Sequence, residues 1–267
     1  MSISYAESML PRGSLTGKTA IVTGGGTGLG KAMAHEFARL GSNVVIASRK
    51  MEVLEETAQE ISETYQCSVV PFSLDIRSSD KVQELMDFVI KKFNNIDILV
   101  NNAAGNFIVD SLAMSDNAWN SVINIVLNGT WYCSQRAARQ MIKQKNGGSI
   151  LNLATTYATF GGPKTVHSAA AKAGVISMTK SLASEWGKHD IRLNAISPGP
   201  ILETGAVDAL YPDEEKQSEM LKNIPLNRFG TKQEIANLAS YLVSDYSKYI
   251  TGSSFIIDGG RSLSKGM

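Results

Sequence analysis

The sequence TTYATFGGPKTVHSAAAKAG, residues 155–174, contains a tyrosine, a serine and a lysine that can polarise a reacting oxygen. Ser168 and Lys172 are four residues apart in a predicted helix, so their side chains share one helix face. Tyr157 follows one predicted strand and Asn106 follows another, and open α/β sheets bind ligands at the carboxyl ends of their strands. The phenol and the amide N–H could converge on one oxygen and stabilise negative charge there.

Each of these residues also has a plainer interpretation. Tyr157 could be an amphipathic side chain packed in a loop, and Asn106 could stabilise a turn. Lys172, taken alone, could be an exposed helix lysine. His167 is more typical of a helix start than of a proton donor. The elements that position these residues therefore decide between the interpretations.

Strand-like apolar runs alternate with helical patterns along the chain. The runs cover residues 19–23, 43–48, 68–73, 97–102, 148–154, 191–197 and 253–258, and the helical patterns cover 28–40, 51–65, 79–93, 117–144 and 166–188. This alternation predicts βαβ units and a parallel sheet buried on both faces. We expect an α/β fold with one doubly wound parallel sheet of the Rossmann type. It would form a single domain over 16–267, after an N-terminal arm over 1–15.

Residues 200–228 interrupt the alternation. They contain Pro200, Pro212 and Pro225 and show little periodicity. An insertion of this kind above the carboxyl ends of the strands can act as a substrate lid. A plain surface excursion is the alternative.

The glycine-rich sequence TGGGTGLG, residues 23–30, joins the first predicted strand to the first predicted helix. Glycine allows a positive φ and lets phosphates approach backbone N–H groups at a helix N-terminus. The sequence thus predicts a dinucleotide site that includes Gly24, Thr27, Gly28, Leu29 and Gly30. A tight turn without a ligand is the alternative.

The second predicted strand ends in Ser48, Arg49 and Lys50, where an NAD-selective site normally has a carboxylate for the ribose 2′-hydroxyl. Two cations at this position can bind a 2′-phosphate instead. We therefore predict NADP(H) as the cofactor. Two solvated cations at a helix start are the alternative.

Composition excludes several classes of partner. The 26 basic and 25 acidic residues nearly cancel, so we expect neither nucleic acid nor a membrane surface as a partner. Cys67 and Cys133 are isolated and the three histidines are far apart, so no metal site is predicted. The first residues lack a mitochondrial presequence pattern, and no apolar run is long enough to cross a bilayer. We expect a cytoplasmic protein.

The motifs together resemble the short-chain dehydrogenase/reductase family. They are TGGGTGLG at 23–30, NNAAG at 101–105, SPGP at 197–200 and DGG at 258–260, so the resemblance extends along the whole chain. It implies that Lys172 contacts the nicotinamide ribose. It also implies further cofactor contacts from Asp75, Ile76, Asn102, Ala103, Gly105, Pro198, Gly199, Pro200 and Ile201.

Ser168 occupies the position of that family's proton-donating tyrosine. Thr155 occupies the position of its catalytic serine, and Asn128 resembles the asparagine of its proton relay. This pattern, with Tyr157 upstream, is similar to the 2,4-dienoyl-CoA reductase branch. The resemblance implies NADPH, an acyl-CoA substrate, and Tyr157 and Asn106 as donors to the dienolate oxygen. It also implies a homotetramer.

Two other functions remain open from the sequence. The first is an NADPH-dependent carbonyl or 3-oxoacyl reductase in which Tyr157 acts as the acid from a shifted position. The second is a catalytically silent NADP(H)-binding protein.

Overall fold

A computed structural model of the protein describes residues 9–204 and 213–263. Its centre is a seven-stranded parallel sheet with the strand order β3-β2-β1-β4-β5-β6-β7. The strands are β1 Thr19–Thr23, β2 Asn43–Ser48, β3 Val69–Ser73, β4 Ile98–Asn101, β5 Gly148–Leu153, β6 Ile191–Pro198 and β7 Ser254–Ile257. Their ends agree with the predicted ends to within one residue. The chain order reverses between β1 and β4, which creates a crevice for ligands at their carboxyl ends.

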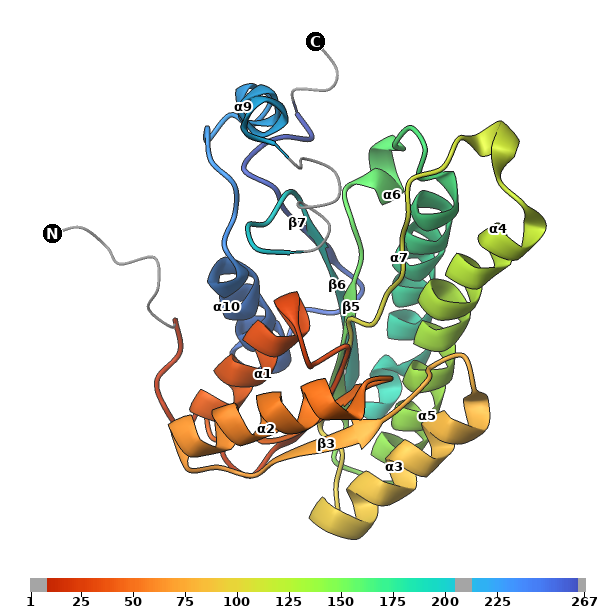
Figure 1. Ribbon diagram of the computed structural model, residues 1–267. Coiled ribbons are helices and arrows are strands. Elements are labelled where there is room, and N and C mark those ends of the chain that lie inside the picture. The colour runs from red at the N-terminus through yellow and green to blue at the C-terminus, as the bar shows by residue number, and fades with distance from the viewer. Residues whose placement is uncertain (1–8, 205–212, 264–267) are drawn as a thin grey trace, which may run out of the picture.

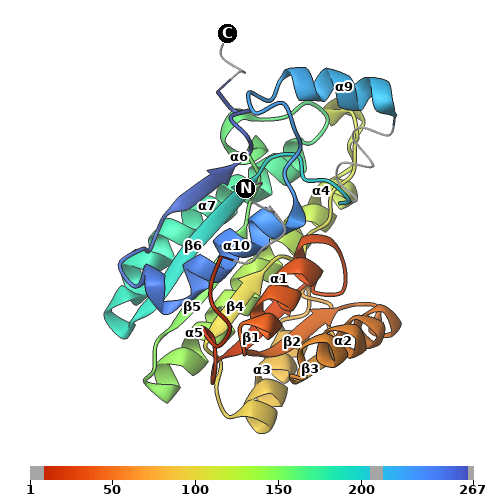
Figure 2. The same ribbon diagram turned by 90° about the vertical axis from the view of Figure 1, so that its left-hand side faces the viewer.

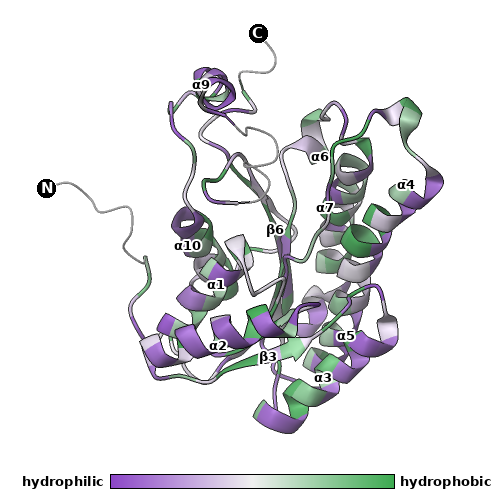
Figure 3. Cartoon of the chain, in the orientation of Figure 1, coloured by the Kyte–Doolittle hydropathy of each residue, from purple (hydrophilic) through white to green (hydrophobic). Residues whose placement is uncertain are grey.

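Helices cover both faces of the sheet, as Figure 1 shows. One face carries α1 Gly28–Arg39, α2 Met51–Tyr65 and α10 Lys232–Val243, and the other carries α3 Ser79–Phe93, α5 Gly129–Gln144 and α7 Val166–Trp186. Because both faces are covered, β1, β2 and β4 are nearly continuous apolar runs without polar alternation. In Figure 3 the hydrophilic residues of α2 and α3 lie on the outside of the molecule.

The predicted helix over 117–144 is interrupted. It consists of α4 Asp116–Ile123, a π-helical turn at Asn124–Asn128, and then α5. The predicted helix over 166–188 ends at Trp186 and is followed by a 3₁₀ turn. Three of the described α-helices have no counterpart in the prediction. These are α10, the four-residue helix α6 Tyr157–Phe160, and α9 Glu214–Lys222.

The segment after β6 returns to the sheet edge before it reaches α10. The Gly230 N–H donates to the Pro200 carbonyl (3.0 Å), and the Leu202 N–H donates to the Gly230 carbonyl (3.0 Å). A short helix, α9 Glu214–Lys222, lies at the same end of the molecule as α6, as Figure 2 shows. Residues 205–212 of the predicted lid lie outside the described residues.

The predicted N-terminal arm is described from residue 9 onward. Leu10 and Leu15 are buried in the main core. The Arg39 guanidinium donates to the Leu10 carbonyl (2.6 Å), which holds this part of the arm against α1. No helix among the described residues is long and apolar enough to span a membrane.

Candidate active site

The turn between β1 and α1 is closed by backbone contacts. The Gly24 N–H donates to the Ala47 carbonyl (2.7 Å), and the Thr23 hydroxyl accepts from the N–H groups of Asn102 and Ala103 (3.0 Å each). Gly24 has φ +66°, and a Cβ atom there would lie 2.8 Å from Nδ2 of Asn102. A glycine is therefore required both by the backbone conformation and by the close approach of the end of β4.

The two helices beside this turn begin without side-chain caps. Thr27 before α1 and Lys50 before α2 make no capping hydrogen bond through their side chains. By contrast, Ser78, Asp213 and Thr231 cap α3, α9 and α10. Uncapped first-turn N–H groups and the positive end of the helix dipole together form an anion site. The starts of α1 and α2 therefore fit the phosphates of a dinucleotide.

A cavity of about 580 Å³ opens between these helix starts and the ends of the strands. This volume is within the range of roughly 300–1,000 Å³ that is typical of small-molecule sites. The predicted cofactor residues that line it are Gly24, Thr27, Gly28, Leu29, Ser48, Arg49, Lys50, Asp75, Ile76, Asn102 and Ala103. The lining residues that the sequence did not indicate are Gly26, Ala47, Val53, Leu74, Arg77, Ala104, Ile125 and Thr204.

The other predicted cofactor residues are not part of this lining. They are Gly30, Gly105, Lys172, Pro198, Gly199, Pro200 and Ile201. Gly30 lies behind the turn, where a side chain would collide with the Gly24 carbonyl, so it allows α1 to pack close to β1. Ile201 is 3 % exposed and belongs to the core. Gly199 packs on Asp258, whose Cβ would lie 2.6 Å from a Cβ at position 199.

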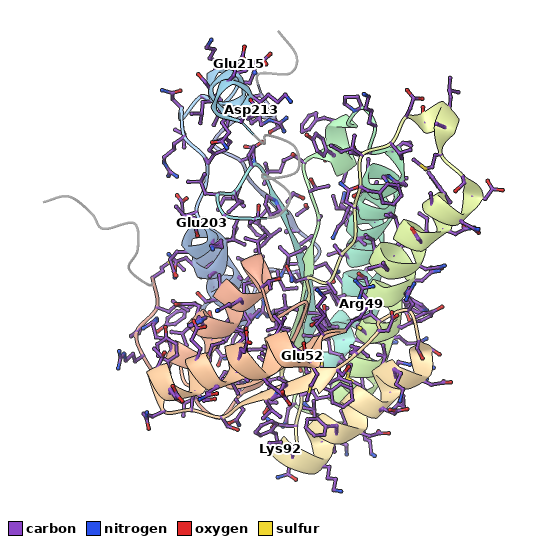
Figure 4. All side chains as sticks on the ribbon, viewed as in Figure 1. Arg49, Glu52, Lys92, Glu203, Asp213 and Glu215 are labelled. Atoms are coloured by element: carbon purple, nitrogen blue, oxygen red, sulfur yellow. The ribbon has the colours of Figure 1, made fainter. Side chains whose placement is uncertain are left out.

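The rim of the cavity carries excess positive charge. Arg77 forms an ion pair with Asp75 (2.5 Å between Nη2 and Oδ2). The hydrogen bonds that the Arg77 side chain donates to the Asp75 carboxylate hold the pKa of Asp75 below its usual range. The nearby charge of Arg49 acts in the same direction. Neither Arg49 nor Lys50 forms an ion pair with a described carboxylate. Figure 4 labels Arg49 near Glu52, at the start of α2.

Lys172 projects from α7 to the carboxyl edge of the sheet. It is 7 % exposed, and its Nζ donates to the carbonyl of Leu153, the last residue of β5. Burial lowers the pKa of Lys172 to about 8. One carbonyl does not replace the hydration shell of an ammonium group, so further oxygen ligands would stabilise the charged form.

Ser168 is buried one turn before Lys172 on the same helix. His167 is the second residue of α7, in agreement with the helix-start interpretation. It is fully buried, and neither ring nitrogen has a hydrogen-bond partner among the described residues. Its ring packs edge-on against Phe107 with 4.5 Å between the ring centroids.

Asn106 is exposed on the irregular segment after β4. Two contacts hold this segment beside the start of α7. One is the Phe107–His167 ring contact, and the other is a hydrogen bond from the Val109 N–H to the Lys164 carbonyl (3.1 Å). Asn106 therefore lies on a segment that adjoins the loop between α6 and α7.

Tyr157 is the first residue of α6, so it lies in a one-turn helix rather than in a loop. Its ring packs closely on Gly162, where a Cβ atom would lie 2.8 Å from the Cδ1 atom of Tyr157. The Arg261 guanidinium lies over the same ring, with 5.5 Å between Cζ and the ring centroid. No local pattern in the sequence indicates Arg261.

Thr155 and Asn128 occupy the edges of the site. Thr155 is half-buried between β5 and α6, and its carbonyl accepts from the Ala158 N–H (3.1 Å). Asn128 is the last residue of the π-helical turn, and its Nδ2 donates to Oδ1 of Asn124 (2.8 Å). Single π turns inside helices occur frequently at functional sites. The roles of Thr155 and Asn128 in catalysis stay predictions.

Comparison with known proteins defines the class. Residues 24–262 match a family model described as enoyl-(acyl carrier protein) reductase. A probable 2,4-dienoyl-CoA reductase, (2E)-enoyl-CoA-producing, of Bacillus subtilis (strain 168) is 49 % identical over 247 residues, which cover 92 % of this chain and 97 % of the relative. The 3-oxoacyl-(acyl-carrier-protein) reductase FabG of Thermotoga maritima is 37 % identical over 246 residues, with coverages of 92 % and 98 %. The crystal structure of a short chain dehydrogenase from Bacillus anthracis superposes with a TM-score of 0.84 at 47 % identity, covering 92 % of this chain and 96 % of that one.

The chain therefore belongs to the short-chain dehydrogenase/reductase family of NAD(P)(H)-dependent oxidoreductases. Within this family it resembles the 2,4-dienoyl-CoA reductase branch, which agrees with the resemblance drawn from the motifs alone.

Proposed function

We propose that the protein is an NADPH-dependent 2,4-dienoyl-CoA reductase that acts on polyunsaturated fatty acyl thioesters in β-oxidation. The observation that carries this proposal is the buried pair of Ser168 and Lys172, with Tyr157 in the one-turn helix α6 that follows β5. A serine hydroxyl is a far weaker acid than a phenol, so this pair suits a substrate whose oxygen needs stabilisation more than protonation. A conjugated thioester is such a substrate.

The proposed preference for NADPH rests on the charges of the cavity rim. Arg49 and Lys50 follow β2 without a described carboxylate partner, and Asp75, the one acid among the described lining residues, is paired with Arg77. These two cations would contact the 2′-phosphate. Lys172 would hold the nicotinamide ribose, whose hydroxyls supply oxygen ligands in addition to the Leu153 carbonyl.

Bound NADPH would supply a hydride to the δ-carbon of the dienoyl thioester. The two electrons of the hydride leave negative charge on the thioester oxygen, and Tyr157 and Asn106 would donate hydrogen bonds to it. A proton from water or an acid then reaches carbon, so the products are an enoyl thioester and NADP⁺. Thr155 and Asn128 would support water and cofactor geometry. The Lys172 charge would stabilise the anionic oxygen through space.

The surroundings of the site suit an acyl chain. Phe107 and Ile108 on one segment, and Phe160 and Val166 around α6, are all exposed apolar side chains. The hydrogen bond between Val109 and Lys164 joins the two segments. Grouped apolar residues at a ligand site favour an apolar substrate.

A direct assay tests this function. The loss of NADPH absorbance is followed with 2,4-hexadienoyl-CoA, a 3-oxoacyl-CoA and a panel of ketones. We expect turnover of the dienoyl thioester and little or none of the ketones. Turnover of the 3-oxoacyl thioester alone would replace this proposal with the carbonyl reductase, a function in the name of the Thermotoga relative. NADPH binding without turnover of any substrate would support a silent binding protein.

We also propose a cytoplasmic homotetramer. The exposed apolar side chains of Tyr246, Tyr249 and Ile256 around β7 support a subunit contact there. Cys67 and Cys133 are free thiols, as expected in a reducing compartment. Light scattering at micromolar concentration should give four times the chain mass, and a monomeric mass would contradict the assembly.

A further inference from the structure

Arg261 is a buried cation in the turn that follows β7. Arg261 as a whole residue is only 7 % exposed. The neighbouring Asp258 forms no ion pair with it among the described residues, and the Asp258 carboxylate accepts from the backbone N–H groups of Gly260 (2.9 Å) and Ser262 (2.8 Å). The acid thus fixes the backbone of the turn, and the turn places Arg261 under α9.

The guanidinium contacts two described side chains, and neither carries a charge. Its Nε donates to the sulfur of Met220 on α9 (3.1 Å), and its Cζ lies 5.5 Å from the ring centroid of Tyr157. No side-chain carboxylate that the structure describes forms an ion pair with it. The exposed Arg228 differs, because it forms an ion pair with Glu234 at 2.6 Å.

Burial of a guanidinium without an acid is unfavourable, and an aromatic face or a thioether offsets only part of that cost. The balance improves when negative charge develops nearby in a space shielded from water. Tyr157 is the group in contact with Arg261 at which the proposed reaction would build such charge. The buried cation is thus arranged to favour a charged transition state over the free enzyme.

We propose that Arg261 is a positioning residue for Tyr157. Its guanidinium holds the phenol ring in place and supplies a positive charge behind it, which stabilises the anionic thioester oxygen in front of the phenol. This inference rests on the proposed function. It adds a residue from the end of the chain to a site that the sequence locates between residues 106 and 172.

The test is a double-mutant cycle. Arg261→Met and Arg261→Lys are made in the wild-type and the Tyr157→Phe backgrounds, and kcat, KM and the NADPH Kd are measured for each. Arg228→Met is the matched control, because it removes an arginine that forms an ion pair with its own acid, Glu234. The wild type is assayed with whichever substrate class it reduces.

We expect Arg261→Met to lower kcat about tenfold, with KM and the NADPH Kd nearly unchanged. Arg261→Lys should restore most of the rate, because it keeps the charge. In the Tyr157→Phe background Arg261→Met should cost less than about twofold, since the hydroxyl group that the proposed positioning serves is absent although the ring remains. Arg228→Met should leave kcat unchanged.

Three results would overturn the inference in an active enzyme. The first is an equal loss in both backgrounds, which would mean that Arg261 acts independently of Tyr157. The second is a lysine variant as slow as the methionine variant, with its NADPH Kd intact. The third is a rise of KM alone, which would assign Arg261 to substrate binding. Absence of dienoyl-CoA turnover in the wild type would instead reject the proposed function, and the cycle would still be read with the substrate that is reduced.

Discussion

The cofactor side and the chemical side of this molecule are built differently. The cofactor side consists of backbone turns at the ends of β1 to β4, and adjacent residues of the sequence define each turn. The chemical side combines the end of β5, the start of α7, the turn after β7 and one residue of α9. The cofactor side therefore depends on side chains mainly at its charged rim, whereas the chemical side depends on each of its converging side chains.

The largest expected effect is on the chemical side. Tyr157→Phe should lower kcat about 10²–10³-fold, because it removes one hydrogen-bond donor to an oxygen that becomes charged only in the transition state. The NADPH Kd should stay nearly unchanged, since the cofactor side does not use this residue. Steady-state kinetics and a fluorescence titration with NADPH measure the two quantities.

Ser168→Ala is the comparison variant for this prediction, and its loss of kcat should be milder. If Tyr157→Phe kept near-normal turnover while Ser168→Ala abolished it, the serine would be the acid. The division of labour between the two residues would then be reversed.

We expect Lys172 to affect both cofactor binding and the chemical step. Its effect on the stability of the folded protein should depend on pH. Its pKa falls from 10.5 to about 8 on burial, so between these values the unfolded chain binds more protons than the folded one. The free energy of unfolding therefore rises with pH across this window, and below pH 8 the folded protein bears the full cost of a charged Lys172. A pKa difference of about 2.5 between the unfolded and folded protein corresponds to about 3 kcal/mol of unfolding free energy.

Urea unfolding of the cofactor-free protein and of Lys172→Met, at pH 7 and at pH 10.5, measures this difference. The advantage of the methionine variant should shrink by up to about 3 kcal/mol at the higher pH. A difference that stayed constant with pH would mean that Lys172 titrates normally in the folded protein. In enzyme assays Lys172→Ala should weaken NADPH binding and kcat together.

Arg49→Ala sharpens the comparison from the cofactor side. Loss of a charge-assisted phosphate contact costs about 1.5–3 kcal/mol, so the NADPH Kd should rise roughly 10- to 100-fold while the NADH Kd changes little. Lys92→Ala is the control, because Figure 4 places Lys92 on a different part of the surface from Arg49. Equal catalytic efficiency of the wild type with NADH and NADPH would refute the cofactor assignment.

The smallest effect should come from Gly162→Ala. A Cβ atom there would meet the Tyr157 ring at 2.8 Å and displace it, so kcat should fall about tenfold while the NADPH Kd is kept. Gly161→Ala is the matched control, because its Cβ atom would meet nothing within 4 Å although its φ is +70°. Equal losses of kcat in both variants would show that loop strain, and not ring placement, matters.

The position of the cavity beside the turn after β1 could be predicted from the sequence for a physical reason. The Gly24 turn and the cations after β2 depend on local backbone geometry and on neighbouring residues in the chain. A short sequence motif indicates such local features directly. Arg77 was missed because its pairing with Asp75 is a choice of side-chain conformation. The helix α6 was missed because four residues carry too little periodicity to be recognised.

The chemical side was predicted only in part. The shared helix face of Ser168 and Lys172 follows from helix geometry, whereas the burial of both residues is a finding of the structure. The contact of Arg261 with Tyr157 joins residues far apart in the sequence, and only the folded chain brings them together. The hydrogen-bonding roles of Tyr157 and Asn106 stay predictions.

The uncapped starts of α1 and α2 have a practical consequence for anyone who handles the purified protein. We expect sulfate or phosphate in the storage buffer to bind at these positions and to raise the melting temperature of the free protein by mass action. The same anions will compete with the dinucleotide and weaken its apparent affinity. Thermal-shift screens and titrations should therefore be run in a buffer without oxyanions. Cofactor titrations at several sulfate concentrations would then give the number of bound anions that the cofactor displaces.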